Sequence, residues 1–413
     1  TEDFVHAMEL ASGFNLTQFR NSWYAQAGTP TLDISSDYDA VKKTFSLSVE
    51  QSCRPTTECA EKKAYHMPLV VGLLNAQGED MDFTVQGQDH AKYLNLTDAK
   101  QTFVLEGVSE KPVPSLLRNF SAPVKKNYAY TAEELCFLLA NDSDAFNRYE
   151  AGQLLAKREL EKLMEQHQND QDLAVDEATL DAFYAVIKDQ GLSNGMKAEI
   201  LVLPTETELV EAMEVCDFDA ADAARTFLTK ALAKKAEFEL KAIYDELNQA
   251  DEYIVNATEM AKRSLKNSAL SYLVSLDKEE YFALAFAQQD KGANMTDEYA
   301  AFVALCHSDS NFHQQSIDLF RQRWANDNLV RNKWFSAQAS SRVGDSLNRV
   351  EQLLDVPEFD FTNPNNIRAV IGAFGANTTR FHEICGEGYH FMADQILAVD
   401  AFNSNIASGL ALS

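Results

Sequence analysis

The segment FSLSV, residues 45–49, alternates apolar and polar side chains one by one. Side chains on a β-strand point to opposite faces in turn, so Phe45, Leu47 and Val49 share one face and the two serines share the other. A second run, residues 67–73, repeats the alternation, and the turn-forming residues 75–78 follow it. This stretch therefore predicts half-buried strands joined by tight turns.

Short alternating runs continue on the C-terminal side, at 101–108, 115–120 and 124–130. Prolines separate them, and proline is disfavoured inside a central strand because it lacks a backbone N–H. Several strands at this spacing predict a small antiparallel β-sandwich over residues 31–130.

The residues before the sandwich favour two short helices. Gly13 is expected to end the first helix, and Asn15 can cap the second. Gly28 and Pro30 then break the chain. A helix pair this small has little core of its own, so residues 1–30 are interpreted as the helical tail of a domain that lies further upstream.

After Tyr130 the apolar period changes from two to about 3.6 and stays there. Thr131 opens Thr-Ala-Glu-Glu, a helix-start signal, and breaks at Gly191, Pro204 and Gly292 separate successive helices. We expect about a dozen helices over residues 131–413, stacked as a HEAT-like superhelix. The chain stops at Ser413 within an amphipathic pattern, so the array is expected to be truncated. The fold class is thus multidomain α+β.

Composition narrows the possible partners and the compartment. The 413 residues carry 36 basic and 63 acidic side chains, a net charge of −27, which disfavours binding to nucleic acid or to an anionic membrane. No stretch approaches the roughly 20 apolar residues that span a bilayer, and the N-terminus lacks the pattern of a signal peptide. Six scattered cysteines without a CxxC motif are read as free thiols, and a cytoplasmic location follows.

No complete catalytic site is expected. Helical zinc hydrolases need two histidines four residues apart with a glutamate beside the first. The nearest approach begins at His382-Glu383, where Gly386 takes the place of the second ligand. Cys385 and His390 could be imagined as further ligands, but the glycine would break the helix that presents them. Phosphate-binding glycine motifs are missing from the sequence as well. We therefore assign no catalytic residue and no metal ligand to this chain.

A series of short sequence motifs resembles the C-terminal part of the bacterial aminopeptidase N family, zinc metallo-aminopeptidases of the gluzincin type. These motifs occur in the same order as in the family and extend over nearly the whole chain. They are WYAQAGTP (23–30), PVPSLL (112–117), FSAPVK (120–125), AEIL with LP (198–204), AKR with Leu265 (261–265), NMTD (294–297), KWF with QA (333–339), and NPN with IR and IGAF (363–374).

The resemblance implies a parent hydrolase that removes N-terminal amino acids from peptides with one zinc ion. In that family the zinc ligands and catalytic residues precede the segment that this chain matches. The chain is then expected to be inactive alone. It would brace the catalytic domain and close over the active site, with the catalytic and N-terminal domains of its own full-length chain, and short peptides in the enclosed chamber, as its partners.

Two residues are implied as substrate contacts. The family places an arginine of the motif N-P-N-x-I-R in the chamber wall, and Arg368 matches it. A guanidinium there can pair with a peptide carbonyl or carboxylate, although a structural salt bridge is the competing reading. Asn405 stands where the family often has a glutamine, as a shorter amide, while Gly409 replaces a family arginine.

An independent helical-repeat interaction protein, binding a partner in its concave face, is the alternative. It would also lack catalytic residues. The reading frame upstream of Thr1 would discriminate, because only the enzyme interpretation expects a histidine pair with an intervening glutamate there.

Overall fold

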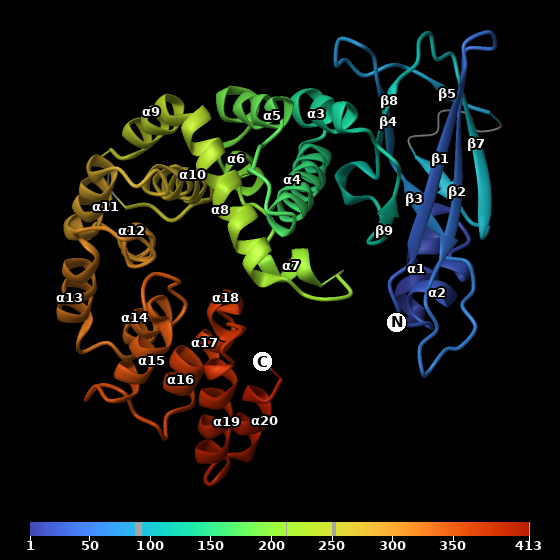
Figure 1. Cartoon of the computed structure of the whole chain (residues 1–413). Helices are drawn as coiled ribbons and strands as arrows, with labels where there is room; N and C mark the ends of the chain where they lie inside the picture. Colours follow the sequence, from blue (N-terminus) through green and yellow to red (C-terminus); the bar gives the residue numbers. More distant parts are fainter. Residues whose placement is uncertain (87–92, 212, 250–252, 413) are drawn as a thin grey trace. The chain divides into compact units, whose positions relative to one another are not determined.

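The computed structural model describes residues 1–86, 93–211, 213–249 and 253–412 (Figure 1). Ser413, at the end of the helix that the sequence predicted to be unfinished, lies outside the described residues. The chain divides into two compact units, Thr1–Leu155 and Ala156–Ser413, and each is described by itself.

The first unit begins with two helices, α1 (Glu2–Ser12) and α2 (Thr17–Trp23). Gly13 ends α1 with a left-handed φ of 72°, a conformation that glycine adopts without steric cost. The side chain of Asn15 accepts the backbone N–H of Thr17 at 2.9 Å and so opens α2. Both predicted roles are confirmed.

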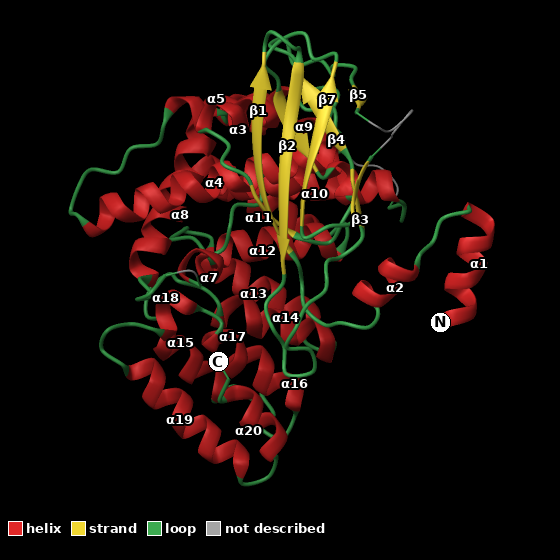
Figure 2. Ribbon diagram, turned by 90° about the vertical axis from the view of Figure 1, so that its right-hand side faces the viewer, coloured by secondary structure: helices red, strands yellow, loops and turns green. Residues whose placement is uncertain are grey.

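Nine short strands follow among the described residues, and they form one five-stranded sheet in the order β5-β7-β2-β1-β9 and two two-stranded sheets, β3-β6 and β4-β8. Figure 2 shows β1, β2 and β7 side by side. Pairing is antiparallel except between β1 and β9. The strands are β1 (Thr31–Asp39), β2 (Thr44–Ser52), β3 (Met67–Leu69), β4 (Val71–Leu74), β5 (Thr84–Val85), β6 (Leu94–Leu96), β7 (Lys100–Glu106), β8 (Val113–Leu116) and β9 (Lys125–Asn127).

The predicted alternation builds the core of this unit. Phe45, Leu47 and Val49 of β2 are almost completely buried, while Ser46 and Ser48 stay partly accessible. The run at 67–73 does not form one strand. It breaks at Val70 into β3, which pairs with β6, and β4, which pairs with β8. One continuous run of alternating side chains therefore forms strands of two different sheets. The side-chain period does not determine which partner strand each part of the run pairs with.

Polar contacts tie the first helices after the sandwich to the strands. Thr131 and Glu134 form a complete capping box at the start of α3 (Ala132–Asn141), as the sequence indicated. Arg118 pairs with Asp142 at 2.9 Å, and Asn147, in the first turn of α4 (Ala145–Gln168), donates to the Ser115 hydroxyl at 2.7 Å. The first compact unit therefore continues past residue 130 into α4.

The second unit is helical among its described residues (Figure 1). Consecutive helices pack against one another, with α10 in contact with α6, α8, α9, α11 and α12. Its helices after α4 are α5 (Glu177–Lys188), α6 (Asn194–Ile200), α7 (Glu206–Val210), α8 (Phe218–Lys235), α9 (Glu237–Leu247), α10 (Ala257–Val274), α11 (Glu279–Lys291), α12 (Met295–Cys306), α13 (His313–Trp324), α14 (Asn328–Ala339), α15 (Ser346–Leu354), α16 (Pro364–Ile367), the π-helical turn η2 (Arg368–Gly372), α17 (Ala373–Gly375), α18 (Thr378–Phe381), α19 (Glu387–Asp400) and α20 (Ser404–Leu410).

Two kinds of packing hold this array. A large apolar cluster joins α12 to α20, with Phe302 and Phe320 stacked at 4.4 Å between ring centroids and Phe374 edge-on to Phe391. A charged cluster, called here the Arg342 cluster, joins residues far apart in sequence: Glu206, Asp222, Arg225 and Arg342. In it Arg342 pairs with Glu206 at 2.7 Å and with Asp222, and Arg225 lies 3.4 Å from Glu206. These pairs join α7 and α8 to the segment between α14 and α15.

Candidate functional site

Arg368 lies in the middle of a helix that runs without a break from Pro364 to Gly375. Asn363 caps this helix by accepting the N–H of Asn365 at 3.0 Å, and Pro364 occupies its first turn, where no N–H is needed. Ile367 and Ala369, on either side of Arg368, are buried in the apolar cluster.

Arg368 itself is exposed, and its guanidinium makes no hydrogen bond or ion pair with any residue that the structure describes. It is the first residue of the π-helical turn, whose wider spacing rotates the following residues relative to an α-helix. The guanidinium is thus held out of the core by buried neighbours on both sides, and its donors stay available to a ligand.

Asn405 is also exposed, near the start of α20. Asn403 caps that helix, and Ile406 and Ala407 anchor it in the same apolar cluster that buries Ile367. One core therefore supports both predicted site residues. No hydrogen bond between Arg368 and Asn405 occurs among the described residues, so the structure places them on one core without joining them directly.

Other arginines of this region are engaged, in contrast to Arg368. Arg380 donates to the Arg342 carbonyl at 2.9 Å and pairs with Glu383 at 2.7 Å. Arg349 donates to the Val343 carbonyl at 2.6 Å, and burial lowers the pKa of its guanidinium. These side chains act within the fold, and Arg368 is distinguished from them by its free donors.

An inner cavity of about 630 Å³, which the sequence did not reveal, lies between α8, α10 and α12. Hydroxyl groups line it at helical spacing, from Thr226 and Thr229 on α8, from Ser271 on α10 and from Ser275, which caps the end of α10. His307 lies at the cavity, and burial lowers its pKa to about 4, so its imidazole is neutral near pH 7. Paired hydroxyls three or four residues apart along a helix are the sequence signal that could have found this lining.

The donors considered for zinc do not form a metal site. Helix α18 ends at Phe381, so His382 lies just beyond it, and Gly386 adopts a left-handed φ of 76°. The His382 ring stacks on Phe218 at 4.3 Å, and its Nδ1 lies 2.7 Å from the Tyr389 hydroxyl. Cys385 and His390 face solvent. Across the part of the chain that is described, no three His, Cys, Asp or Glu side chains are grouped to hold a metal ion.

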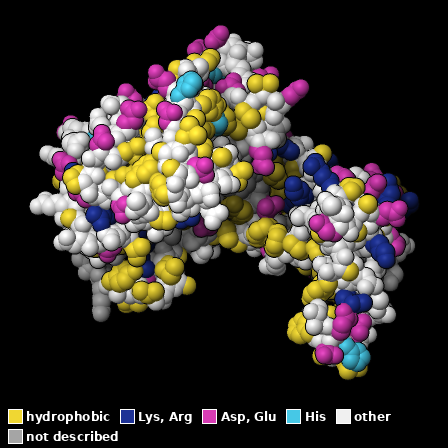
Figure 3. All heavy atoms as spheres, turned by 90° about the horizontal axis from the view of Figure 1, so that it is seen from below, with side chains coloured by type: hydrophobic (Ala, Val, Ile, Leu, Met, Phe, Trp, Pro, Cys, Tyr) yellow, Lys and Arg dark blue, Asp and Glu magenta, His cyan; other side chains and the backbone are white. Residues whose placement is uncertain are grey.

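The surface has two further features. Asp and Glu side chains are spread over the face seen in Figure 3, as the net charge of −27 requires. In the first unit, Phe4 and Leu10 of α1 and Phe14, two residues beyond it, are exposed. No described helix combines the length and the apolar composition needed to cross a lipid bilayer.

Two domain families match the chain. Residues 28–129 match the Ig-like fold of the domain of unknown function DUF3458, and residues 132–413 match the ARM repeats of the domain of unknown function DUF3458_C. The predicted sequence of a β-sandwich followed by a helical repeat array is confirmed by these matches and by the structure.

Characterised relatives carry the name aminopeptidase N. The chain is 35% identical over 410 residues to aminopeptidase N of Escherichia coli (strain K12), a match that covers 99% of this chain and 47% of the relative. The corresponding protein of Haemophilus influenzae is 34% identical, with the same coverage, and that of Caulobacter vibrioides is 32% identical over 99% of this chain and 46% of its own length.

A solved structure agrees with these relatives. The crystal structure of Legionella pneumophila aminopeptidase A in complex with aspartic acid superposes with a TM-score of 0.80 at 27% identity, covering 99% of this chain and 47% of that one. The chain thus spans about half the length of the relatives it matches.

Proposed function

Since the chain belongs to the DUF3458_C family of ARM-repeat domains, we propose that it is the C-terminal scaffold and chamber-closing part of a zinc aminopeptidase that removes N-terminal amino acids from peptides. The observation that carries this proposal is the match of 99% of the chain, without interruption of its two-part order, to about half of each aminopeptidase N relative. In this proposal residues 1–30 end the catalytic domain, 31–130 form the brace and 131–413 form the chamber wall.

Zinc would be held by another part of the full-length enzyme. The donor set of this chain does not fit the ion, because Gly386 stands where a second histidine is needed and His382 is engaged by Phe218 and Tyr389. We derive no catalytic step from this chain. The six cysteines carry no disulfide, which is in keeping with the proposed cytoplasmic location.

Arg368 is proposed to bind peptide in the assembled chamber. An exposed guanidinium with free donors can form a bidentate pair with the C-terminal carboxylate of a short peptide or hydrogen bonds with its carbonyls. Asn405 would add one amide near the start of α20. The apolar exposed face of α1 would be covered by the rest of the catalytic domain.

The decisive experiment uses the full-length enzyme with Arg368→Gln, assayed on a tripeptide and on an aminoacyl chromogenic amide that has no carboxylate. We expect KM for the tripeptide to rise about tenfold, since a charge-assisted hydrogen bond contributes ~1.5–3 kcal/mol, while kcat and the chromogenic reaction change little. Arg54→Gln, a similar change at an exposed arginine of the first unit, is the control.

Equal effects on both substrates, or no effect on either, would remove Arg368 from the peptide site. The scaffold role is tested separately. The 413-residue chain alone should show no aminopeptidase turnover, and chelator-sensitive turnover by the pure chain would contradict the proposal.

A further inference from the structure

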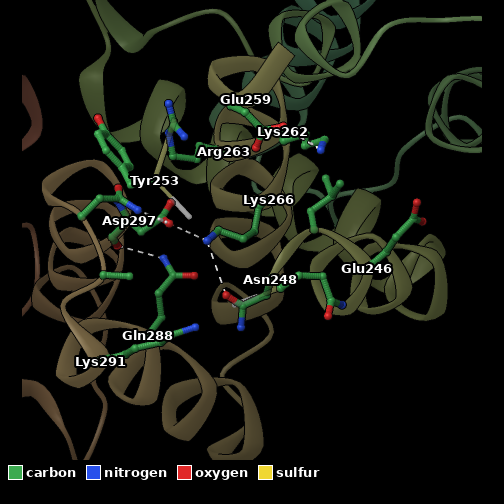
Figure 4. Close-up of a pocket in the computed structure, with 14 residues that line it drawn as sticks. Glu246, Asn248, Tyr253, Glu259, Lys262, Arg263, Lys266, Gln288, Lys291 and Asp297 are labelled. Atoms are coloured by element: carbon green, nitrogen blue, oxygen red, sulfur yellow. Dashed lines mark hydrogen bonds and ion pairs between the residues drawn. The ribbon is translucent and has the colours of Figure 1, made fainter. Parts of the chain in front are cut away.

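A second cavity, of about 390 Å³, lies at the end of α9 between α10, α11 and α12 (Figure 4). Its size falls within the range of small-molecule pockets, about 300–1,000 Å³. Four cationic side chains line it, Lys262, Arg263, Lys266 and Lys291, against three carboxylates, those of Glu246, Glu259 and Asp297. In a chain of net charge −27 this is a locally positive site.

The floor of the cavity is a buried ion pair. Lys266 Nζ lies 2.6 Å from Asp297 Oδ2, and the two side chains are only 6% and 7% exposed. Asn267 and Asn294 donate to Asp297 at 3.0 and 2.8 Å, and Lys266 reaches Asn248 Oδ1 at 3.4 Å. These contacts offset the desolvation of both charges, so the pair needs no ligand to be stable.

Gln288, beside this pair, is not fully satisfied. It is 95% buried, as its exposed fraction is 5%. Its Nε2 donates to Asn267 Oδ1 at 2.9 Å and to the Asp297 carbonyl at 2.8 Å, and these bonds fix the orientation of the amide. Its Oε1 accepts no hydrogen bond from the residues described. Figure 4 shows this oxygen directed into the cavity, toward the space beside Lys266 and Asn248.

A buried acceptor without a donor costs about 1–3 kcal/mol. A bound molecule with an N–H group would recover that cost. Since the amide cannot turn without losing both Nε2 bonds, the ligand must bring a donor to this position.

The rim of the cavity carries positively charged side chains, which can bind an anionic group. Arg263 lies over the Tyr253 ring at 4.8 Å and gives one N–H to the Ile254 carbonyl, which leaves further donors of its guanidinium available. Lys291 is exposed and has no ion-pair partner in the described part of the chain. Lys262, by contrast, is held by Glu259 at 2.7 Å. Arg263 and Lys291 lie on opposite sides of the cavity in Figure 4, so each offers a separate position for a small anionic group.

From these two features we propose that the cavity binds a small zwitterion, a free α-amino acid or a short peptide. The carboxylate pairs with Lys291 or with Arg263, which lie on opposite sides of the cavity, and the ammonium or amide N–H donates to Gln288 Oε1. A bare anion such as phosphate satisfies the rim alone and meets the carboxylates of Glu246 and Asp297. This site involves none of the residues used in the proposed function and does not rest on it.

The test is isothermal titration of the 413-residue chain with alanyl-alanine and with alanine, which separate the peptide and the amino acid as sources of the zwitterion. Propionate and alaninamide each carry half of the recognised chemistry, and inorganic phosphate carries the anion alone. We expect one of the two zwitterions to bind in the millimolar range or tighter. The half-ligands and phosphate should bind at least about tenfold more weakly.

Variants locate the binding. Arg263→Gln with Lys291→Gln, both side chains at the rim, should weaken the zwitterion about tenfold or more. Arg54→Gln with Lys234→Gln makes the same charge change at exposed positions elsewhere and should leave binding unchanged. Gln288→Met removes the acceptor at similar length and should also weaken binding. If the Gln288→Met change prevents folding, the double variant of Arg263 and Lys291 alone tests the proposal.

Three results would overturn the proposal: no heat of binding from either zwitterion, phosphate binding as tightly as the zwitterion, or equal affinity in the rim variant and its control.

Discussion

Two arginines of the helical unit stand in opposite situations. Arg342 is held by the carboxylates of Glu206 and Asp222, and its own carbonyl accepts from Arg380. Arg368 has buried neighbours on both sides, yet its guanidinium meets no carboxylate in the described chain. The charge of Arg342 is thus used in interactions within the fold, whereas the charge of Arg368 stays exposed and available to a ligand. The following predictions test that separation in order of effect.

The strongest case of engaged charge is the buried pair of Lys266 and Asp297. Lys266→Ala leaves a carboxylate buried without its cation, which costs about 3–5 kcal/mol in the free energy of unfolding. Urea denaturation followed by circular dichroism measures this. Lys291→Ala is the matched control, because that lysine is exposed, and it should change stability by less than about 0.5 kcal/mol. Similar losses in both variants would contradict the distinction.

Arg342→Ala should have the next largest effect. Glu206 is nearly buried and would keep only Arg225, at 3.4 Å. We expect a loss of about 2 kcal/mol, less than for Lys266 because the Arg342 side chain is 34% exposed. Thermal and urea unfolding of Arg342→Ala and Arg368→Ala compare the two arginines directly. The idea fails if Arg368→Ala is the more damaging change.

A pH titration extends the comparison to His307, which lines the cavity between α8, α10 and α12. Burial lowers the pKa of His307 to about 4, whereas an unfolded histidine titrates near 6.5. Between these values the unfolded state binds the proton and the folded state does not, so stability is present above about pH 6.5 and falls as the pH drops toward 4. Because the ring is partly accessible, we expect this contribution to be about 1 kcal/mol.

His307→Gln should flatten the stability profile in that window, and the unfolding midpoint in urea at several pH values measures it. The surface change His167→Gln serves as control. An unchanged slope in His307→Gln would assign the pH dependence to other groups.

The smallest stability effect is expected for Arg368→Ala, below about 0.5 kcal/mol, since no ion pair of the described structure is lost. Its consequence should instead lie in substrate binding, through the tripeptide KM. Lysine at this position should restore the charge but not the bidentate geometry, and so recover only part of the affinity. A melting temperature lowered as far as in Arg342→Ala would identify Arg368 as structural.

Local patterns in the sequence were sufficient for local structure. Phe45, Leu47 and Val49 are buried as their alternation predicts, and Thr131 begins a helix with a complete capping box. The motif shared with the aminopeptidase N family identified Arg368 as a candidate substrate contact, but it gave no information on the environment of this side chain. Exposure there depends on a π-helical turn that apolar periodicity does not encode.

Contacts between segments that lie far apart in the sequence could not be predicted from it. Lys266 and Asp297 lie on different helices, and the charges of Glu206 and Arg342 meet only when α7 and the segment after α14 are brought together. An orphan acceptor such as Gln288 Oε1 is defined by what surrounds it in three dimensions. Such features follow from tertiary packing, which a single sequence constrains only weakly.

The π-helical turn at residues 368–372 bears on how this region varies among relatives. Such a turn holds one residue more than an α-helical turn would, so deleting one residue inside it would restore regular geometry. The wide turn already absorbs that extra residue, so the side chains on both sides of the deletion would keep their faces, and only the residues within the turn would change position. A homologue with a one-residue gap at this point should therefore present a different side chain where this protein presents its arginine, even if the surrounding letters align.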